Sequence, residues 1–542
     1  MSSPRFFYKR VLSRCAFGGV ALLFVGSLPA AQLQGTSSSA LPYVNLDPGF
    51  SASTIYSVLT VGDSVNNKAD GTPYRMVGLP DGLGAYDNNN GTFTVLMNHE
   101  LGSTAGIARA HGDNGAFISQ WVINKSDLRV VSGQDLIQQV ALWNGSGYSA
   151  PVQSSTFDFN RFCSADLAAP TAYYNPATGL GTQARIFMNG EEAGEEGRAF
   201  AHVATGAAAG TSYQLPALGR LSWENAVANP FAGNKTIVIG TDDSTPGQVY
   251  LYEGTKTDTG NDVEKAGLTN GSLYGIKING VTAENRATGI DGVADNRDTA
   301  AVVFQSIGNV TSLTGAQLTT LSDANGVTNF LRPEDGAWNP LNPNEFFFVT
   351  TDQFSTLKAG SGSTDGRSRL WRLTLADLND LSTGGKLEML LEGGTGPLGN
   401  AGQMFDNITV DGSGSIIIQE DPGNNAYLAK LWQYNPATGR LIELAAHNPS
   451  YFLSGGSSFL TQDEESSGII DITDIMGGSS GGDRWYLFDT QAHAALGGEL
   501  VEGGQLMAMH YVPVPEPATY GLIGAAALTG LVAVRRLRRK KI

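Results

Sequence analysis

The amino-acid sequence predicts an all-β protein, either a propeller or a sandwich. Short β-branched or aromatic runs recur throughout the 542-residue chain, separated by turns rich in Gly, Asn, Asp and Pro. Glycine contributes 69 residues without a Gly-X-Y repeat, which excludes collagen and favours turn-rich β structure. No long amphipathic helical pattern occurs, and only residues 313–323 and 374–381 are expected to form short helices.

The first 30 residues have the pattern of a secretory signal peptide. Four basic residues precede an apolar stretch over residues 16–28, and the small residues Ala30 and Ala31 follow Pro29. The apolar stretch is short for a permanent membrane anchor. We therefore expect export of the chain and cleavage near Ala30.

Apolar runs that lead directly into acidic residues recur along the body of the chain. They begin at Val95, Ile186, Ile237, Phe346 and Ile416 and lead into Glu100, Glu191-Glu192, Asp242-Asp243, Asp352 and Glu420-Asp421, with a weaker copy from Trp485 into Asp489. Continuous apolar runs are typical of strands buried on both faces, such as the inner strands of propeller blades. If the runs are equivalent strands, their acids gather at one end of a central channel, where oxygen ligands would select Ca²⁺ or Mg²⁺. Alternatively, the acids only solvate turns at the strand ends.

Cys163 is the only cysteine that remains after the signal peptide, which carries Cys15, is removed. An intrachain disulfide is then impossible, so stability must come from the core and from bound cations. A lone thiol in an exported protein is either buried and inert or held by a metal. The cysteine count leaves both interpretations open.

The predicted mature body is strongly acidic. Removing the ten basic residues and one acid of the two chain ends from the totals of 34 and 51 leaves 24 basic and 50 acidic side chains, a formal charge of −26. Such a surface repels nucleic acid and anionic lipid. We therefore exclude nucleic acid as the main partner.

The segment Arg332-Pro333-Glu334-Asp335-Gly336 joins a guanidinium to two acids just before the Phe346 run. An acid in this arrangement can bind a cation, while the planar guanidinium pairs with an oxyanion such as phosphate. Arg332 and Glu334 are accordingly the candidate catalytic residues, and Arg332 the candidate phosphate-binding residue. A small anionic substrate would suit this site.

The C-terminus has three parts in a fixed order: Pro515-Glu516-Pro517, an apolar run over residues 520–534, and six Arg or Lys residues within 535–541. Fifteen helical residues rise about 22 Å, which makes a marginal membrane span. The basic cluster should stay in the cytoplasm, with the body outside. This end resembles the PEP-CTERM sorting signal of Gram-negative bacteria. The resemblance implies transient inner-membrane anchoring, removal of the tail by an exosortase-type protease, and release to the cell surface or an exopolysaccharide matrix.

An ordered set of motifs over about residues 45–510 resembles the PhoX-type alkaline phosphatase family. The motifs are Asn98-His99-Glu100, the segment around Cys163, Trp223-Glu224-Asn225, Arg332-Pro333-Glu334-Asp335-Gly336, Asp406-Asn407 and Glu420-Asp421. The resemblance implies a six-bladed β-propeller with large insertions, and a cluster of Ca²⁺ and Fe³⁺ ions in its channel that hydrolyses phosphate esters.

The resemblance also implies roles for individual residues. Cys163 would be an iron ligand, and Glu224, Glu334, and Glu420 or Asp421 would bind metals. Arg332 would hold the phosphate, and Glu100, next to His99, is a further candidate metal ligand. The chain has Lys9-Arg10 where twin-arginine export uses an Arg-Arg pair, so iron would be acquired outside the cytoplasm.

The predicted organisation is a signal peptide over residues 1–30, a propeller domain over 31–512 and a sorting segment over 513–542. As an enzyme, the protein would use metals to polarise a phosphoryl oxygen and to supply an oxygen nucleophile. The alternative is a non-catalytic, Ca²⁺-stabilised surface propeller that binds matrix polysaccharide. Calcium content without iron and without turnover would identify this alternative.

Overall fold

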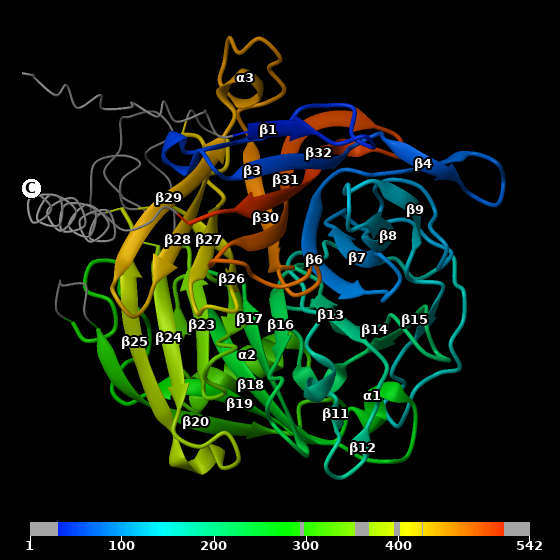
Figure 1. The fold of residues 1–542 in the computed structure, drawn as a ribbon. Coiled ribbons are helices and arrows are strands. Elements are labelled where there is room, and N and C mark those ends of the chain that lie inside the picture. The colour runs from blue at the N-terminus through cyan, green and yellow to red at the C-terminus, as the bar shows by residue number, and fades with distance from the viewer. Residues whose placement is uncertain (1–30, 293–297, 353–367, 395–401, 425–426, 514–542) are drawn as a thin grey trace, which may run out of the picture.

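Mostly antiparallel sheets follow one another around the protein (Figure 1). The computed structural model describes residues 31–292, 298–352, 368–394, 402–424 and 427–513. The expected signal peptide with Ala30, and the motif Pro515-Glu516-Pro517 with the apolar run behind it, lie outside these residues. Within the described ranges, no helix combines the length and apolar character needed to cross a membrane.

Two sheets contain the beginning of the described chain. One consists of β6 (Pro80–Asp87), β7 (Thr92–His99), β8 (Phe117–Asn124) and β9 (Val130–Asp135), in that order. The other has the order β1 (Ala31–Gln34), β3 (Thr54–Thr60), β32 (Val501–Tyr511), β31 (Arg484–Gly497) and β30 (Glu464–Asp471). Because β3 pairs antiparallel with β32, the two ends of the described chain share one sheet.

The largest sheet lies in the middle of the chain. Its main path is β16 (Trp223–Ala228), β17 (Lys235–Asp242), β18 (Gly247–Thr255), β19 (Ser272–Ile278), β20 (Thr299–Gly308), β25 (Gly385–Glu392), β24 (Arg369–Leu375), β23 (Glu345–Thr350) and β22 (Pro333–Trp338), and β21 (Asn329–Phe330) pairs with β18. The first and last strands of this path, β16 and β22, contact each other. The sheet therefore nearly closes on itself.

Two further sheets and two hairpins complete the β structure of the described residues. One sheet has the order β13 (Ile186–Gly190), β14 (Ala199–Val203), β15 (Thr211–Gln214) and β10 (Gln139–Ala141), and the other β26 (Phe405–Val410), β27 (Ile416–Glu420), β28 (Lys430–Asn435), β29 (Arg440–His447) and β2 (Val44–Leu46). The hairpins pair β4 (Ser64–Asn67) with β5 (Pro73–Arg75) and β11 (Tyr174–Asn175) with β12 (Leu180–Gly181). Strands dominate, which confirms the predicted all-β class.

Helices are few and short among the described residues: α1 (Asp262–Lys265), α2 (Gly315–Ala324) and α3 (Pro449–Phe452). The helix predicted over residues 313–323 corresponds to α2, which begins at a capping box formed by Thr314 and Gln317. The helix predicted over 374–381 is wrong, because residues 374–375 complete β24 and a turn follows.

We call the runs of consecutive strands that begin at β6, β13, β16, β22, β26 and β30 strand groups, and the strand that begins each run its first strand. The first strands of successive strand groups contact one another. β13 contacts β16, β16 contacts β22, β22 contacts β26, β26 contacts β30, and β30 contacts β6. The sequence predicted that the apolar runs are the inner strands. Only the Ile186 run is a first strand, β13. The others form the second strands β7, β17, β23, β27 and β31. Second strands read as continuous apolar runs because neighbouring strand groups cover both of their faces, whereas polar residues interrupt the first strands.

Apolar clusters fill the spaces between successive strand groups. One cluster joins β13–β15 to β16–β18 around Trp223, and a second joins β16–β20 to β22–β25 around Trp371. Four more join β22–β24 to β26–β28, β27–β29 to β30–β32, β30–β32 to β6–β8, and β6–β8 to β13–β14. Each first strand is thus held by packing on both sides.

Gly190 at the end of β13 allows a close approach to β16. A Cβ atom on Gly190 would lie 2.3 Å from the Cβ and Cγ atoms of Trp223, which immediately precedes Glu224. We therefore expect Gly190→Ala to lower the free energy of unfolding by about 1–3 kcal/mol through overpacking. Denaturant unfolding of the variant and of Gly147→Ala would measure this. Gly147 has no neighbour within 4 Å of an added Cβ, so its variant is the matched control. Equal unfolding free energies for the two variants would contradict the packing.

Candidate active site

Four first strands begin with the same irregularity, a β-bulge that contains an acid. The pairing register shifts between Pro80 and Leu83 in β6, Trp223 and Ala226 in β16, Pro333 and Gly336 in β22, and Phe405 and Ile408 in β26. The first residue inside each bulge is Asp81, Glu224, Glu334 or Asp406. A bulge interrupts strand pairing and re-aims a side chain, which allows these four acids to leave the regular pleat.

The second residues of the bulges link neighbouring strands below the acids. Gly82, Asn225, Asp335 and Asn407 line a cavity of about 220 Å³. The Nδ2 group of Asn225 donates to Oδ1 of Asp335 at 2.6 Å, and Oδ2 of Asp335 accepts from the backbone N–H of Ile408 at 3.0 Å. These bonds connect β16, β22 and β26 and so fix the relative positions of the acids that the strands carry.

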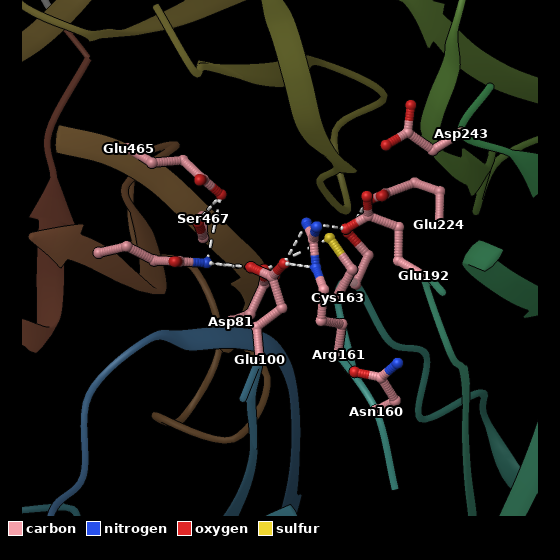
Figure 2. A network of polar contacts seen from close by, with 12 residues as sticks. Asp81, Glu100, Asn160, Arg161, Cys163, Glu192, Glu224, Asp243, Glu465 and Ser467 are labelled. Atoms are coloured by element: carbon pink, nitrogen blue, oxygen red, sulfur yellow. Dashed lines mark hydrogen bonds and ion pairs between the residues drawn. The ribbon is translucent and has the colours of Figure 1, made fainter. Parts of the chain in front are cut away.

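Asp81, Glu100 and Cys163 form one group of side chains that could hold a metal ion, with ligand atoms within 4.8 Å of one another. The Sγ atom of Cys163 lies 3.5 Å from Oδ2 of Asp81. Gln491 Nε2 donates to Asp81 at 3.0 Å and to Glu100 at 2.9 Å, which holds both carboxylates in place (Figure 2). The structure thus brings together the predicted residues Cys163 and Glu100 and adds Asp81.

Two more groups of possible metal ligands share one side chain. Glu224, Glu334 and Asp406 form the second group, and Asp406, Asp421 and Glu465 form the third. Because Asp406 belongs to both, two cations bound here would be neighbours. All of these side chains are buried except Asp421, which is partly buried.

Of the alternative ligands Glu420 and Asp421, only Asp421 takes part in these groups. The carboxylate of Glu420 accepts hydrogen bonds from the backbone N–H of Gln403 at 2.6 Å, from Trp432 Nε1 at 2.8 Å and from the backbone N–H of Lys430 at 2.9 Å. Tyr427 donates to it as well. Its acceptor sites are thus used by the protein, so the geometry favours Asp421 as the metal ligand.

Two arginines border the acidic groups. Nε of Arg332 lies 2.7 Å from Oδ1 of Asp243 and 2.9 Å from Oε1 of Glu334. Nη2 of Arg161 lies 2.6 Å from Oε1 of Glu100 (Figure 2). The predicted phosphate-binding residue Arg332 therefore lies beside Glu334, and Arg161 is a second arginine that the sequence did not single out.

Other predicted acids lie outside these groups. Asp352, at the end of the Phe346 run, forms a forked pair with Arg286 at 2.6–2.9 Å. Asp242 accepts from the backbone N–H of Ser222 and from the hydroxyl of Ser244. His99 is buried and stacks on Phe117, with its ring nitrogens bonded to Gly78 O and Ser119 Oγ, so it serves the core.

Burial dominates the electrostatics of the site. It raises the pKa of Asp81, Glu224, Glu334 and Asp406 well above the usual range, and neighbouring carboxylates add to the shift in each. Burial likewise raises the pKa of the Cys163 thiol, with Asp81 as the next cause. Each group would be protonated without a positive partner, and a bound cation would reverse this preference.

Glu465 is an exception because a histidine lies behind it. Burial alone would raise the pKa of Glu465, but hydrogen bonding and charge from His493 hold it below the usual range. Burial alone would lower the pKa of His493. Hydrogen bonding and charge from Glu465 and Glu502 outweigh burial and raise this pKa to about 11. Nδ1 of His493 lies 2.9 Å from Glu502. His493 is therefore positively charged at neutral pH and keeps Glu465 ionised.

A chain of buried polar side chains positions the Cys163 segment. Asn98 Nδ2 donates to the carbonyl oxygen of Cys163 at 2.6 Å. The hydroxyl of Ser164 donates to Oε1 of Glu224 at 2.5 Å and accepts from Nδ2 of Asn407 at 2.5 Å. Ser164 thus links the thiol segment to two bulged strands, β16 and β26.

The donor set fits divalent or trivalent cations. Nine carboxylates approach one another here and two arginines oppose them: Asp81, Glu100, Glu192, Glu224, Asp243, Glu334, Asp406, Asp421 and Glu465, with Arg161 and Arg332. The second and third groups offer only oxygen, which hard cations such as Ca²⁺ prefer. The thiolate of Cys163 makes the first group suitable for a transition metal.

Several of these residues escaped the sequence analysis. Asp81, Glu465, Gln491 and Arg161 were not singled out, and Asp406 was only part of a motif. One usable signal was the repeated start of the first strands, Pro80-Asp81-Gly82, Trp223-Glu224-Asn225, Pro333-Glu334-Asp335 and Phe405-Asp406-Asn407. Each has Pro or an aromatic residue, then an acid, then Gly, Asn or Asp.

Comparison with protein families gives two matches. The family model described as alkaline phosphatase PhoX matches residues 202–476, about half of the chain. This range contains Glu224, Arg332, Glu334 and Glu465 but begins after Cys163. The model described as PEP-CTERM protein-sorting motif matches residues 513–539. A search of curated proteins gives no match.

Solved structures show a likeness in fold. Pseudomonas fluorescens PhoX in complex with vanadate, a transition-state analogue, aligns with a TM-score of 0.53 and 14% identity, over 90% of this chain and 97% of that chain. A putative 6-phosphogluconolactonase from Bacteroides uniformis aligns with a TM-score of 0.31 and 11% identity, over 66% and 82% of the two chains. Only the first likeness supports a shared fold.

The raised carboxyl pKa values predict how cations affect stability. For example, burial and then Glu465 raise the pKa of Asp421 from 3.8 to about 7. Without cations, the folded protein keeps protons that the unfolded chain releases, so stability falls as pH rises from about 4 to 7. We expect metal-free protein to have a lower Tm at pH 8 than at pH 5, and added Ca²⁺ to raise Tm more at pH 8. Calorimetry after chelation and dialysis would measure both. A metal-free Tm that rises from pH 5 to pH 8 would contradict the repulsion.

Proposed function

Because the chain belongs to the alkaline phosphatase PhoX family, we propose that it is an exported, metal-dependent phosphatase that hydrolyses phosphate esters at the acidic site described above. The observation that carries the proposal is the meeting of four bulged acids with Cys163 and Arg332. This arrangement offers cation ligands next to a guanidinium. Phosphoryl transfer depends chiefly on positioning and on electrostatic stabilisation, both of which such a site can supply.

We further propose that the strand groups are the six blades of a propeller. Their inner strands would be β6, β13, β16, β22, β26 and β30. Two observations support this: apolar clusters join each pair of successive strand groups, and the inner strands contact one another in order. The largest sheet would then be two blades joined through the pairing of β20 with β25. Its near closure would reflect the contact of adjacent blades.

Three metal positions follow from the three side-chain groups. Asp81, Glu100 and Cys163 would hold iron, while Glu224, Glu334 and Asp406, and Asp406, Asp421 and Glu465, would hold Ca²⁺. Cations at these positions supply Lewis-acid polarisation of a phosphoryl oxygen and activation of the oxygen nucleophile. Glu420 would have a structural role, since its oxygens already accept hydrogen bonds.

Arg332 would bind the substrate through its planar guanidinium. The side chain is about one-third exposed and its Nε group is held by Asp243 and Glu334. This fixes the orientation of the guanidinium before substrate arrives, so little ordering is needed at the moment of reaction. Arg332 would then donate to phosphoryl oxygens and stabilise charge that develops on them.

The sorting motif supports export and processing. A chain with this motif would be anchored in the inner membrane, with its body outside, and cut by an exosortase-type protease. Its destination would be the cell surface or an exopolysaccharide matrix. A phosphatase there would act on phosphate esters that reach the cell from outside.

Metal removal tests the proposed activity. We expect the purified exported protein to hydrolyse p-nitrophenyl phosphate, to lose most turnover in EDTA, and to regain it with Ca²⁺. Elemental analysis by mass spectrometry would give calcium and iron per chain. Turnover that resists chelation would contradict the metal mechanism. Calcium without any turnover would instead favour a non-catalytic, cation-stabilised surface propeller.

Substitution of Arg332 tests its role in catalysis. We expect Arg332→Ala to lower kcat by about 100- to 1000-fold, as loss of an oxyanion-stabilising donor does, and Arg332→Lys to lower it less. Calcium content should not change. Arg129→Ala is the control, because Arg129 is half exposed and 4.0 Å from its partner Asp127. Phosphatase rates that match the wild type in Arg332→Ala would rule out the assignment.

A further inference from the structure

Arg161 and Arg332 have parallel environments at the candidate active site. Arg161 Nη2 lies 2.6 Å from Glu100 and 2.5 Å from Glu192, and Arg332 Nε lies 2.7 Å from Asp243 and 2.9 Å from Glu334. In each case one partner, Glu100 or Glu334, is also a candidate metal ligand. Each arginine therefore borders a different metal group.

Both arginines also have an uncommon backbone conformation. Their φ angles are +46° for Arg161 and +62° for Arg332, in the left-handed region that is unfavourable for a residue with a side chain. The backbone of Arg161 is held from two sides, since its N–H donates to Leu101 O at 2.8 Å and its carbonyl accepts from Glu192 N–H at 2.9 Å. Such strain persists where the surroundings impose it, and it concentrates at functional sites.

The partners of the two arginines are themselves connected. Glu192 and Asp243 are close enough that the charge of Asp243 helps to raise the pKa of Glu192, after burial and Glu100. Arg161, Glu192, Asp243 and Arg332 thus form a continuous polar chain beside the metal groups, and Figure 2 shows its first three members. The two guanidinium groups are thus each anchored by acids that lie near one another.

Arg161 has donor capacity left for a ligand. Its hydrogen bonds use Nε, which donates to Glu100 at 2.8 Å, and Nη2, which donates to Glu192 at 2.5 Å. Within the described ranges, Nη1 has no hydrogen-bond partner. The side chain is 47% exposed, although Glu100 beneath it is nearly buried. A small anion can therefore reach the guanidinium from solvent.

We propose that Arg161 is a second phosphate-binding residue, which contacts a phosphoryl oxygen that Arg332 does not reach and thereby favours dianionic phosphate monoesters over monoanionic diesters. This inference rests on the proposed phosphatase function. Two guanidinium groups at fixed spacing offer separate donors to two terminal oxygens. A diester has one terminal charge fewer, so it gains less from the second arginine.

Two substitutions test this role without changing the fold. Arg161→Gly removes the side chain at a backbone angle that glycine adopts easily, so we expect the backbone to be kept, while loss of the ion pairs with Glu100 and Glu192 lowers Tm. Arg161→Lys keeps the charge but loses the planar fork. Arg220→Ala is the control, because Arg220 pairs with Glu196 on the surface at 3.1 Å.

The measurements are kcat and KM with p-nitrophenyl phosphate and with bis-p-nitrophenyl phosphate, together with calcium and iron content. For Arg161→Gly we expect kcat/KM to fall about 10- to 100-fold on the monoester, as loss of a charged hydrogen bond predicts, and less on the diester. Arg161→Lys should recover part of the loss. Unchanged kcat/KM on the monoester would overturn the proposal. So would equal losses on both esters with reduced metal content, which would indicate a purely structural role.

Calorimetric titration with inorganic phosphate separates this inference from the proposed function. If the wild type hydrolyses neither ester but binds phosphate, and Arg161→Gly weakens that binding, the phosphatase function fails and the second phosphate contact stands. If Arg161→Gly binds phosphate as tightly as the wild type, the contact is wrong even where the enzyme is active. If the wild type neither turns over nor binds phosphate, both proposals fail.

Discussion

Mutual repulsion among buried carboxylates is the constraint on which this structure depends. Asp81, Glu224, Glu334 and Asp406 come from four different strands, and the fold brings them together in surroundings where an ionised carboxylate is costly. Repulsion of this kind would push the strands apart unless positive charge is present. His493 and the two arginines supply only part of it, so the remaining carboxyl groups must be either protonated or, as proposed above, neutralised by bound cations. With cations bound, stability and chemistry would be coupled in this protein.

The bulges reconcile the acids with regular strand pairing. A regular strand directs successive side chains to opposite faces, so an acid next to an apolar residue would face one sheet surface or the other. In β6, β16, β22 and β26 the bulge adds an unpaired residue, and one bulge side chain joins the metal groups while the next lines the cavity below. Left-handed residues directly precede three of these strands: Leu79, Arg332 and Met404. Part of the left-handed backbone of the chain is therefore located where the ligands meet.

Composition and turn spacing were sufficient to predict the all-β class. The ordered motifs grouped Cys163, Glu100, Glu224, Glu334, and Glu420 or Asp421 as candidate ligands, and of these only Glu420 lies outside the ligand groups. The strand order was harder to predict. Apolar runs such as Val95-Leu96-Met97 mark the most buried strands, which here are second strands, while the acids that interrupt first strands hide their pattern. The spacing of the apolar runs does not mark Asp81 or Glu465, because both lie in first strands, Asp81 in a bulge of β6 and Glu465 in the regular pairing of β30 before its bulge. Glu420 and Asp421 are neighbours, and only their surroundings separate a structural acid from a ligand.

The pairing of β3 with β32 sets an order of events during biosynthesis. In an exported chain, β3 emerges early and must wait for its partner until the last strand has crossed the membrane. The candidate metal ligands extend from Asp81 to Glu465, with Gln491 behind them, so the site is incomplete for almost the whole of translocation. The contacts that close the ring are among the most distant in sequence, which makes this a slowly folding topology. Because β32 ends at Tyr511, only a short linker separates the closing strand from the sorting segment. In the proposed exported and metal-loaded protein, ring closure and metal loading would therefore be late steps beside the membrane.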